Sequence, residues 1–144
     1  MKKMDANQAH AQAARVGILL VNLGTPQAPT AAAVRTYLKE FLSDPRVVEI
    51  PKLIWWFILN CIILPIRSGA SAKKYQSIWM NGVNGAPSGS PLLVYSRAQA
   101  AMLGQKFGSD VVVELAMRYG QPSIESVLDK MNQKGVDRLL VVPL

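Results

Sequence analysis

Apolar and polar residues alternate in blocks along the chain, and these blocks predict strands separated by helices. The run Ile18–Leu23 is apolar except for Asn22, and the turn residues Gly24–Pro26 end it. A short apolar run of this kind is typical of a strand buried on both faces of a parallel sheet. The segments Val111–Met117 and Arg138–Leu144 are also rich in apolar and β-branched residues, and they predict two further strands.

The first predicted helix begins after Thr30, whose hydroxyl can accept a hydrogen bond from the first turn. Its apolar residues have the i, i+3, i+4 spacing of one helix face and are Val34, Tyr37, Leu38, Phe41 and Leu42. Pro45 ends this helix, because the residue before a proline avoids the α conformation. The segment Arg46–Ile50 is then predicted to be a short extended link.

Two more helices are predicted later in the chain. The pair Ser90-Pro91 suits the cap and first turn of one helix, although Ser96 offers a later start, and Gly108 ends it. Ser123 caps the other helix, and Gly135 ends it. The core-facing residues of the two helices are expected to be Leu103, Phe107, Ile124, Val127, Leu128 and Met131.

The stretch Leu53–Leu64 contains eleven apolar residues and Asn60, and basic residues lie on both sides of it. Because a bilayer span takes about 20 apolar residues, this run is too short to cross a membrane. Three interpretations fit it. It is a helix buried in the core, an interfacial segment that presents Trp55 and Trp56 to lipid headgroups, or a wall of a pocket for a flat apolar ligand with carboxylates.

The order of strands and helices predicts an α/β domain with a Rossmann-like parallel sheet over residues 16–144, after a flexible tail at residues 1–15. The segments Ala72–Trp79 and Asn81–Gly89 are predicted to be a helix and a loop. Ligands of parallel sheets bind at the carboxyl ends of the strands, which makes Leu23–Pro26 and Arg118–Gly120 the expected functional edge. A parallel strand is normally followed by a covering element, so we expect further chain after Arg138–Leu144.

The composition restricts the classes of function. The 144 residues carry a net charge of +7, which allows anionic partners such as lipid or a small acidic ligand. The basic residues are scattered and do not alternate with aromatic residues, so nucleic acid is not an expected partner. The sequence also lacks the glycine motifs with which nucleotide-binding proteins hold phosphates.

Groups for acid–base or metal chemistry are scarce in the sequence. His10 is the single histidine and lies in the predicted tail, and Cys61 is the single cysteine and is expected to be a buried thiol. These counts exclude a disulfide framework and a histidine–cysteine metal site within the chain. The residues by themselves therefore predict a ligand-binding α/β domain without its own general acid or base.

The chain also carries four sequence blocks in a fixed order, Gly17–Pro26, Phe41–Val48, Gly89–Ser96 and Ala116–Gly120. Together these blocks resemble bacterial ferrochelatases over about residues 15–144. The resemblance implies a chelatase-like fold with two Rossmann-like halves and a porphyrin cleft between them, of which this chain is an amino-terminal part that is incomplete at its C-terminal end. It also implies that ferrous iron and protoporphyrin IX are the substrates of the last step of haem synthesis, with no cofactor held by these residues.

The resemblance implies a set of positions in the porphyrin cleft, namely Leu23, Lys74, Tyr75, Ser90, Arg118 and Tyr119. Leu23 corresponds to a side chain beneath the porphyrin centre, and Lys74, Tyr75 and Ser90 correspond to positions at the ring edge and its propionates. Arg118 and Tyr119 correspond to a pair that lines the cleft.

The resemblance also assigns the Leu53–Leu64 run to a lip that walls the pocket and leans on the membrane. We therefore expect a cytoplasmic protein with a peripheral contact at the inner membrane. By the same resemblance, the Asn81–Ser88 loop looks longer than the loop of most members of the family.

The proton-accepting histidine of the family and its partner glutamate are expected beyond Leu144. We therefore expect no catalytic or metal-binding residue within the 144 residues and no activity from this chain alone. Two other functions remain open from the sequence: a porphyrin- or haem-binding module without catalysis, and a membrane-surface module.

Overall fold

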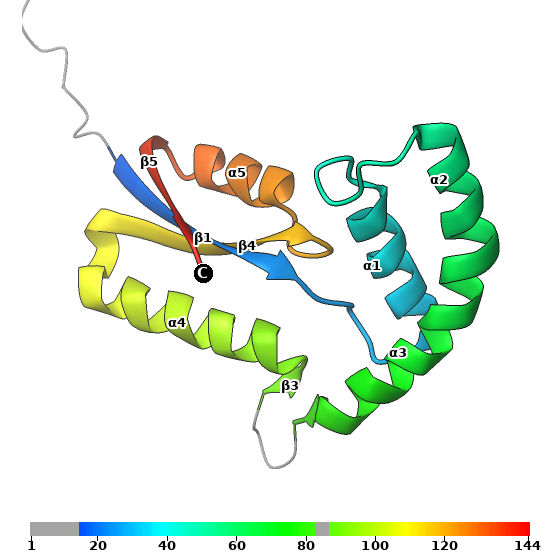
Figure 1. The fold of residues 1–144 in the computed structure, drawn as a ribbon. Coiled ribbons are helices and arrows are strands. Elements are labelled where there is room, and N and C mark those ends of the chain that lie inside the picture. The colour runs from blue at the N-terminus through cyan, green and yellow to red at the C-terminus, as the bar shows by residue number, and fades with distance from the viewer. Residues whose placement is uncertain (1–14, 83–86) are drawn as a thin grey trace, which may run out of the picture.

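The computed structural model describes residues 15–82 and 87–144, and Figure 1 shows their elements in two groups. The first group is a parallel sheet of β1 (Arg15–Gly24), β4 (Val111–Tyr119) and β5 (Val136–Pro143), in the spatial order β4-β1-β5. The second group is a set of helices beyond one end of the sheet. The predicted tail, including His10, lies outside the described residues except for Arg15, which begins β1.

The central strand β1 is paired along its length with both neighbours. Leu20 is in register with Leu115 of β4 on one side and with Val142 of β5 on the other. Ile18, Leu19 and Leu20 are buried, as the apolar run predicted. The three predicted strands and the α/β fold class are thus confirmed, and β5 begins at Val136, two residues before the predicted start.

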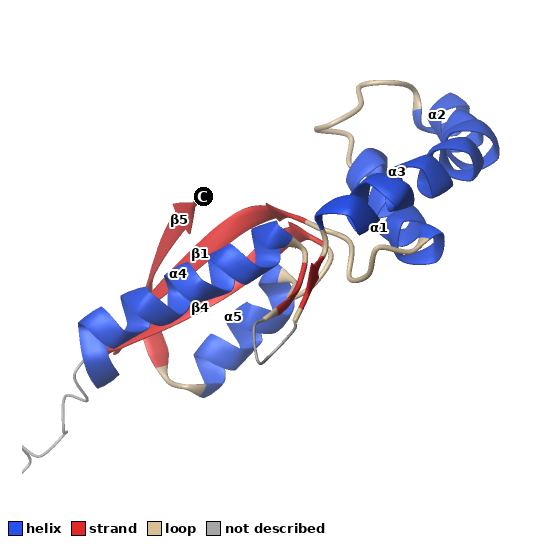
Figure 2. Cartoon of the chain, turned by 90° about the horizontal axis from the view of Figure 1, so that it is seen from below, coloured by secondary structure: helices blue, strands red, loops and turns tan. Residues whose placement is uncertain are grey.

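Two helices cover the two faces of the sheet: Figure 1 shows α5 on one side of the strands and α4 on the other, and Figure 2 shows the same elements from below. The helix α4 (Pro91–Phe107) packs on the face of Ile18 and Leu20, and α5 (Ile124–Gln133) packs on the face of Leu19. The two faces alternate because successive side chains of a strand point in opposite directions.

Most of the predicted boundaries of these two helices are confirmed. Ser90 and Ser123 each accept a hydrogen bond from the first turn of their helix, so the alternative start at Ser96 is wrong. Leu103, Val127 and Met131 pack in the core as expected. The expected burial of Phe107 and Leu128 is wrong, because both lie on the open sides of their helices. A short 3₁₀ turn, η3 (Gly108–Asp110), follows α4.

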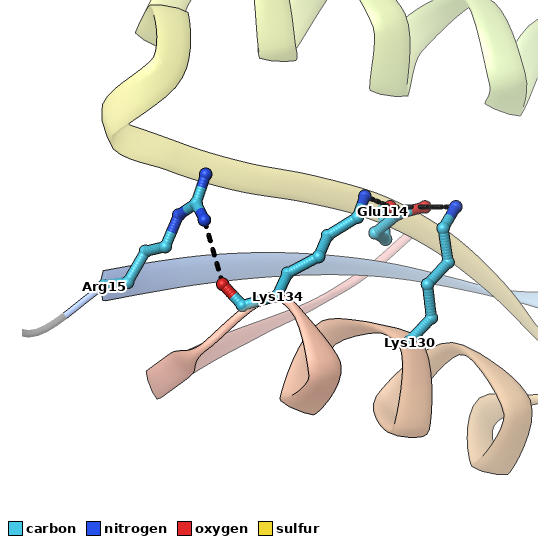
Figure 3. Close-up of polar contacts among 4 residues, drawn as sticks. All are labelled: Arg15, Glu114, Lys130 and Lys134. Atoms are coloured by element: carbon cyan, nitrogen blue, oxygen red, sulfur yellow. Dashed lines mark hydrogen bonds and ion pairs between the residues drawn. The ribbon is translucent and has the colours of Figure 1, made fainter.

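The contact between α5 and the sheet includes a group of charges, drawn in Figure 3. Lys130 of α5 and Lys134, the residue that follows this helix, place their Nζ atoms 3.0 Å and 2.6 Å from the Glu114 carboxylate of β4. Burial opposes ionisation of Glu114, but the hydrogen bonds from Lys134 and Lys130 outweigh it and keep the pKa of this carboxyl below its usual range. Arg15 donates to the Lys134 carbonyl at 2.9 Å, which ties the start of β1 to the end of α5.

The helix α1 (Ala31–Ser43) begins and ends where the sequence predicts. The Thr30 hydroxyl accepts from the Ala33 N–H, and the chain leaves the helix at Asp44. The predicted extended link at Arg46–Ile50 is wrong at its start, because a turn forms there. The backbone N–H of Arg46 donates to the Asp44 carboxylate at 2.9 Å, and the N–H of Val47 donates to the Asp44 carbonyl at 2.9 Å.

A long helix follows this turn, made of α2 (Lys52–Ile58), the π-helical turn η1 (Leu59–Ile63) and α3 (Leu64–Ile78). The predicted helix Ala72–Trp79 is its last part. In η1 the Leu64 N–H donates to Leu59, five residues back. Pro65 follows directly, and its ring would clash with a normal preceding turn, so the wider turn lets the helix continue through it. Asn60 Nδ2 donates to the Trp56 carbonyl at 2.8 Å within this turn.

The apolar half of this long helix is largely exposed. Leu53 is 81% exposed and Phe57 63%, whereas Leu59 and Leu64 are buried. The interpretation of Leu53–Leu64 as a buried core helix is therefore wrong, and so is the prediction of a buried Cys61. Within the described residues, Lys52–Ile78 is long and apolar enough to cross a membrane by length and composition, unlike the shorter run considered from the sequence.

The segment between α3 and α4 contains a small antiparallel pair, β2 (Met80–Asn81) and β3 (Ser88–Gly89). The predicted loop is thus in part a hairpin. Residues 83–86, at its centre, lie outside the described residues.

Candidate functional site

The carboxyl ends of β1 and β4 bring two of the predicted site residues together. Asn22 is in register with Met117, and Gly24 with Tyr119, so Leu23 and Arg118 occupy matching positions between these pairs. Partners in a parallel pair face the same side of the sheet. Both side chains are open to solvent, Leu23 at 51% and Arg118 at 40% exposure. An apolar and a cationic group therefore stand side by side at this edge.

Asn22, the polar residue within the apolar strand, has a local reason for its position. Its amide Nδ2 donates to the Ser96 hydroxyl of α4 at 3.2 Å, and its Oδ1 accepts the Leu23 N–H at 2.8 Å. These two bonds fasten the end of β1 to α4 and fix the backbone that carries Leu23.

One face of α1 joins the helical group to this edge of the sheet. The side chains at i, i+3, i+4 and i+7 point to it because they share a helix face. The Tyr37 hydroxyl donates to the Gly24 carbonyl at 3.2 Å, and the Glu40 carboxylate accepts the Gly120 N–H at 2.9 Å. The rings of Phe41 and Tyr119 meet edge to face with centroids 5.1 Å apart.

Asp44, the next residue on this face, contacts both predicted site residues of β4. Its Oδ2 atom accepts from Arg118 Nη2 at 2.8 Å and from the Tyr119 hydroxyl at 3.0 Å. The hydrogen bond from the Arg46 N–H, followed by those from Arg118 and Tyr119, lowers the pKa of Asp44 to about 2. Asp44 is therefore ionised at neutral pH and holds the end of β4 against the end of α1.

Two further tyrosines, Tyr37 and Tyr75, have pKa values shifted by their surroundings. Burial, followed by the nearby Tyr75 and Tyr119, raises the pKa of Tyr37 to about 12. Burial also raises the pKa of Tyr75 on α3. Tyr37 thus lies near two predicted site residues, Tyr75 and Tyr119, and the raised pKa values of Tyr37 and Tyr75 keep these two hydroxyls neutral at neutral pH.

Two grooves of different chemistry adjoin beside Asp44. The first has a volume of 300 Å³ and is mostly apolar, lined by Ser43, Pro45, Val48, Ile50, Lys52, Trp55, Trp56 and Leu59. The second, of 540 Å³, is a shallow hollow that we call the polar groove because most of its lining residues are polar or charged: Glu40, Ser43, Asp44, Pro45, Arg46, Arg118 and Tyr119. Because Ser43 and Pro45 belong to both, an aromatic wall continues into a region with two arginines.

The remaining predicted site residues, Ser90 and Lys74, belong to the start of α4 and to α3. Ser90 is 2% exposed, and its hydroxyl accepts the Leu93 N–H at the start of α4. Lys74 is exposed on α3. In residues 15–82 and 87–144, no group of three or more histidine, cysteine or carboxylate side chains is arranged to hold a metal ion.

Sequence reasoning missed Tyr37, Glu40 and Asp44 as parts of this site. The spacing of Tyr37 and Phe41 predicts only an apolar helix face, and the sequence marks Asp44 only as part of the block Phe41–Val48. The available signal was the coincidence of a carboxylate at the end of a helix with Arg118 at the end of a strand, because helix and strand ends meet at one edge of such a sheet.

Comparisons with known proteins match nearly the same residues that the structure describes. The chain matches the sequence model of the Ferrochelatase family over residues 15–144. It is 58% identical over 137 residues to the ferrochelatase of Herminiimonas arsenicoxydans, covering 93% of this chain and 36% of that protein. It is 56% identical over 139 residues to that of Chromobacterium violaceum, covering 94% and 36%.

A third relative extends the match over nearly the whole chain. The ferrochelatase of Alcanivorax borkumensis is 52% identical over 146 aligned residues, covering 99% of this chain and 41% of that protein. The chain thus spans 36% to 41% of the length of these three relatives. With the family match over residues 15–144 and the parallel sheet flanked by helices, the chain belongs to the ferrochelatase family.

Proposed function

We propose that these residues form one wall of a porphyrin cleft in an enzyme that inserts ferrous iron into protoporphyrin IX to form haem. The observation that carries the proposal is the family match over residues 15–144. The relatives named above are ferrochelatases, and 93% to 99% of this chain aligns with them.

The chemistry of the two adjoining grooves supports a ligand of this class. Protoporphyrin is a flat apolar ring with two carboxylates on one edge. Trp55 and Trp56 offer an apolar surface, and Arg46 and Arg118 offer cations in the adjoining groove. Guanidinium groups suit carboxylates because their N–H groups form a planar fork.

The proposal leaves the proton chemistry to other residues of the protein. Metal insertion requires removal of two pyrrole protons, and a positioned base accelerates such a step by about 10²–10⁴-fold. The described residues include no histidine, and the carboxylates of Glu40 and Asp44 already accept hydrogen bonds from β4 and its following loop. We therefore propose that this chain binds and orients the porphyrin without supplying the base.

The exposed half of the long helix supports a second part of the proposal, a peripheral contact with the cytoplasmic membrane from the cytoplasmic side. Leu53, Trp56 and Phe57 present apolar surface, and Arg67, Lys73 and Lys74 follow on the same helix. Aromatic residues beside cations are typical of segments that lie at an anionic lipid surface.

The test is metal insertion by the protein expressed from its own gene, with zinc or iron and protoporphyrin followed by fluorescence. We expect turnover by this protein and none by the polypeptide of residues 1–144. Porphyrin binding without turnover by the protein from its own gene would instead favour a non-catalytic binding module. The absence of both porphyrin binding and turnover would contradict the proposal.

Three variants test the roles of the residues. We expect Lys74→Ala and Ser90→Ala to raise the porphyrin KM by about ten-fold or more with little change in kcat, because a charged hydrogen bond contributes roughly 1.5–3 kcal/mol. Leu23→Ala is expected to lower kcat or to change the preference for the metal. Lys73→Ala is the matched control, since Lys73 is an exposed neighbour on the same helix. An unchanged KM in the first two variants would contradict their assignment to the porphyrin edge.

A further inference from the structure

We infer that Asp44 is the positioning residue of the site: it holds the Arg118 guanidinium in place for a carboxylate of the ligand and does not touch the ligand itself. The inference rests on the proposed function, because it gives Arg118 a porphyrin carboxylate as its partner.

The hydrogen bonds of Asp44 occupy both of its carboxylate oxygens. Oδ1 accepts the Arg46 N–H at 2.9 Å, and Oδ2 accepts from Arg118 and Tyr119 at 2.8 Å and 3.0 Å. An anionic ligand would be repelled by Asp44 and attracted by Arg118. Asp44 therefore acts on such a ligand through Arg118.

Helix stability does not account for a carboxylate at this position. Asp44 is the C-terminal cap residue of α1, and a negative charge at a helix C-terminus is unfavourable because the peptide dipoles make that end negative. The contacts that offset this cost lie outside the helix, on β4 and on the turn that leads to α2. The position of Asp44 is thus explained by the groups that it joins.

The geometry leaves Arg118 both restrained and available. Asp44 is the carboxylate with which Arg118 forms an ion pair among the described residues, and the pair uses one of the five N–H donors of the guanidinium. The side chain remains 40% exposed and lines the polar groove. Because a restrained side chain loses less conformational freedom on binding, the ion pair favours capture of a carboxylate.

Glu40 is the other carboxylate of this groove, and it binds the backbone and not an arginine side chain. It accepts the Gly120 backbone N–H at 2.9 Å, so it fixes the loop after β4. Arg46 lines the same groove and is held to Asp44 through its backbone. Of the two carboxylates, Asp44 alone forms an ion pair with an arginine of this groove within the described residues.

A double-mutant cycle on the protein expressed from its own gene tests the inference, using Asp44→Asn, Arg118→Gln and the two changes together. Asparagine keeps the size of the side chain and removes its charge. We expect Asp44→Asn to raise the porphyrin KM about ten-fold with kcat changed less than about two-fold. In the Arg118→Gln background the same change should alter KM less than about two-fold, because residues that act as one unit are not additive.

The split between KM and kcat separates positioning from a structural role. Loss of folded protein lowers kcat in both backgrounds, so equal effects of Asp44→Asn in both would overturn the inference, as would an unchanged KM. Glu49→Gln is the matched control, since Glu49 is an exposed carboxylate of the same connecting segment. If Asp44→Asn does not fold, Tyr119→Phe removes one of the two side-chain donors to Asp44, and its smaller rise in KM should likewise vanish in the Arg118→Gln background.

A failure of the proposed function gives a different result. If the unchanged protein does not insert metal, the cycle is measured as the dissociation constant of protoporphyrin by fluorescence. The same pattern in that constant would support the role of Asp44 for a bound porphyrin, and its absence would overturn it.

Discussion

Gly24 of β1 lies against the backbone of Tyr119 of β4 at the site. Its φ is 119°, which is unfavourable for any residue with a Cβ atom. A Cβ built at this position would also overlap the backbone carbonyl oxygen of Tyr119, an atom that cannot move without displacing β4. The strand register that places Leu23 beside Arg118 therefore requires glycine at position 24.

This geometry predicts opposite effects for two glycine-to-alanine changes. Gly24→Ala is expected to destabilise the fold by more than about 3 kcal/mol, because backbone strain adds to a backbone overlap. Gly69→Ala is expected to stabilise it by about 0.5–1 kcal/mol, because Gly69 lies within α3 with no atom within 4 Å of the added methyl group.

Denaturant unfolding of the protein from its own gene, followed by circular dichroism, measures both effects. Gly69→Ala serves as the control for the chemical change itself. A loss of stability in Gly24→Ala no larger than about 1 kcal/mol would contradict the contact between Gly24 and Tyr119.

At the scale of elements, the two tryptophans of α2 have different surroundings. Trp55 donates from Nε1 to the Leu42 carbonyl at 2.6 Å and lines the apolar groove, so it fastens α2 to the end of α1. Trp56 is 57% exposed, and its ring meets that of Phe57 with centroids 5.9 Å apart. Both tryptophans therefore line the apolar groove, and Trp56 in addition contributes to the exposed aromatic surface.

These surroundings predict that substitutions of Trp55 and Trp56 have different effects on vesicle binding. Trp56→Ser with Phe57→Ser should weaken binding to anionic vesicles, because exposed aromatic surface is lost without loss of an internal hydrogen bond. Trp55→Phe, which removes the bond to Leu42 and keeps the aromatic ring, should leave vesicle binding nearly unchanged. The cationic part of the attraction should fall with added salt, as screening shortens the reach of Arg67, Lys73 and Lys74.

Co-sedimentation with vesicles containing phosphatidylserine at two salt concentrations measures these effects. Vesicles of phosphatidylcholine alone are the control for the lipid charge. If Trp55→Phe weakens binding as much as the double change, or if salt has no effect, α2 is a groove wall and not a lipid contact.

The elements that the sequence predicted well are those with local causes. Thr30, Ser90 and Ser123 cap their helices through hydroxyls that bond within the next turn, so the signal and the structure lie within a few residues. The strand Ile18–Leu23 was similarly predictable, since a central strand must be apolar on both faces.

The errors concern residues whose environment depends on distant contacts. The role of Asp44 in the site depends on Arg118 and Tyr119, which lie 74 and 75 residues away in sequence. Cys61 and Phe57 have the apolar neighbours of a core segment, yet the core of this fold is filled by other elements and leaves them exposed. Composition within a window cannot distinguish an apolar surface from an apolar core.

For the whole molecule, the sheet is asymmetric. The helices α4 and α5 cover β4 and β1, whereas Leu139, Leu140 and Val141 of β5 are exposed. Leu140 is in register with Ile18 and Val141 with Leu19, so the exposed residues extend both core faces of the central strand. Exposed apolar strands of this kind are typical sites of association.

We therefore predict that the polypeptide of residues 1–144 self-associates at concentrations on the order of 100 µM, because β5 and its apolar side chains are free to pair with another chain. Leu140→Lys should reduce this association, since an exposed charge on an edge strand opposes pairing and costs little in a side chain that is 56% exposed. Met102→Lys on α4 is the matched control, because it adds the same charge at a residue that is 70% exposed but lies away from β5. Sedimentation velocity over a range of concentrations gives the association state of each variant. If both changes reduce association equally, net charge controls association. If the unchanged polypeptide is monomeric, β5 does not mediate self-association.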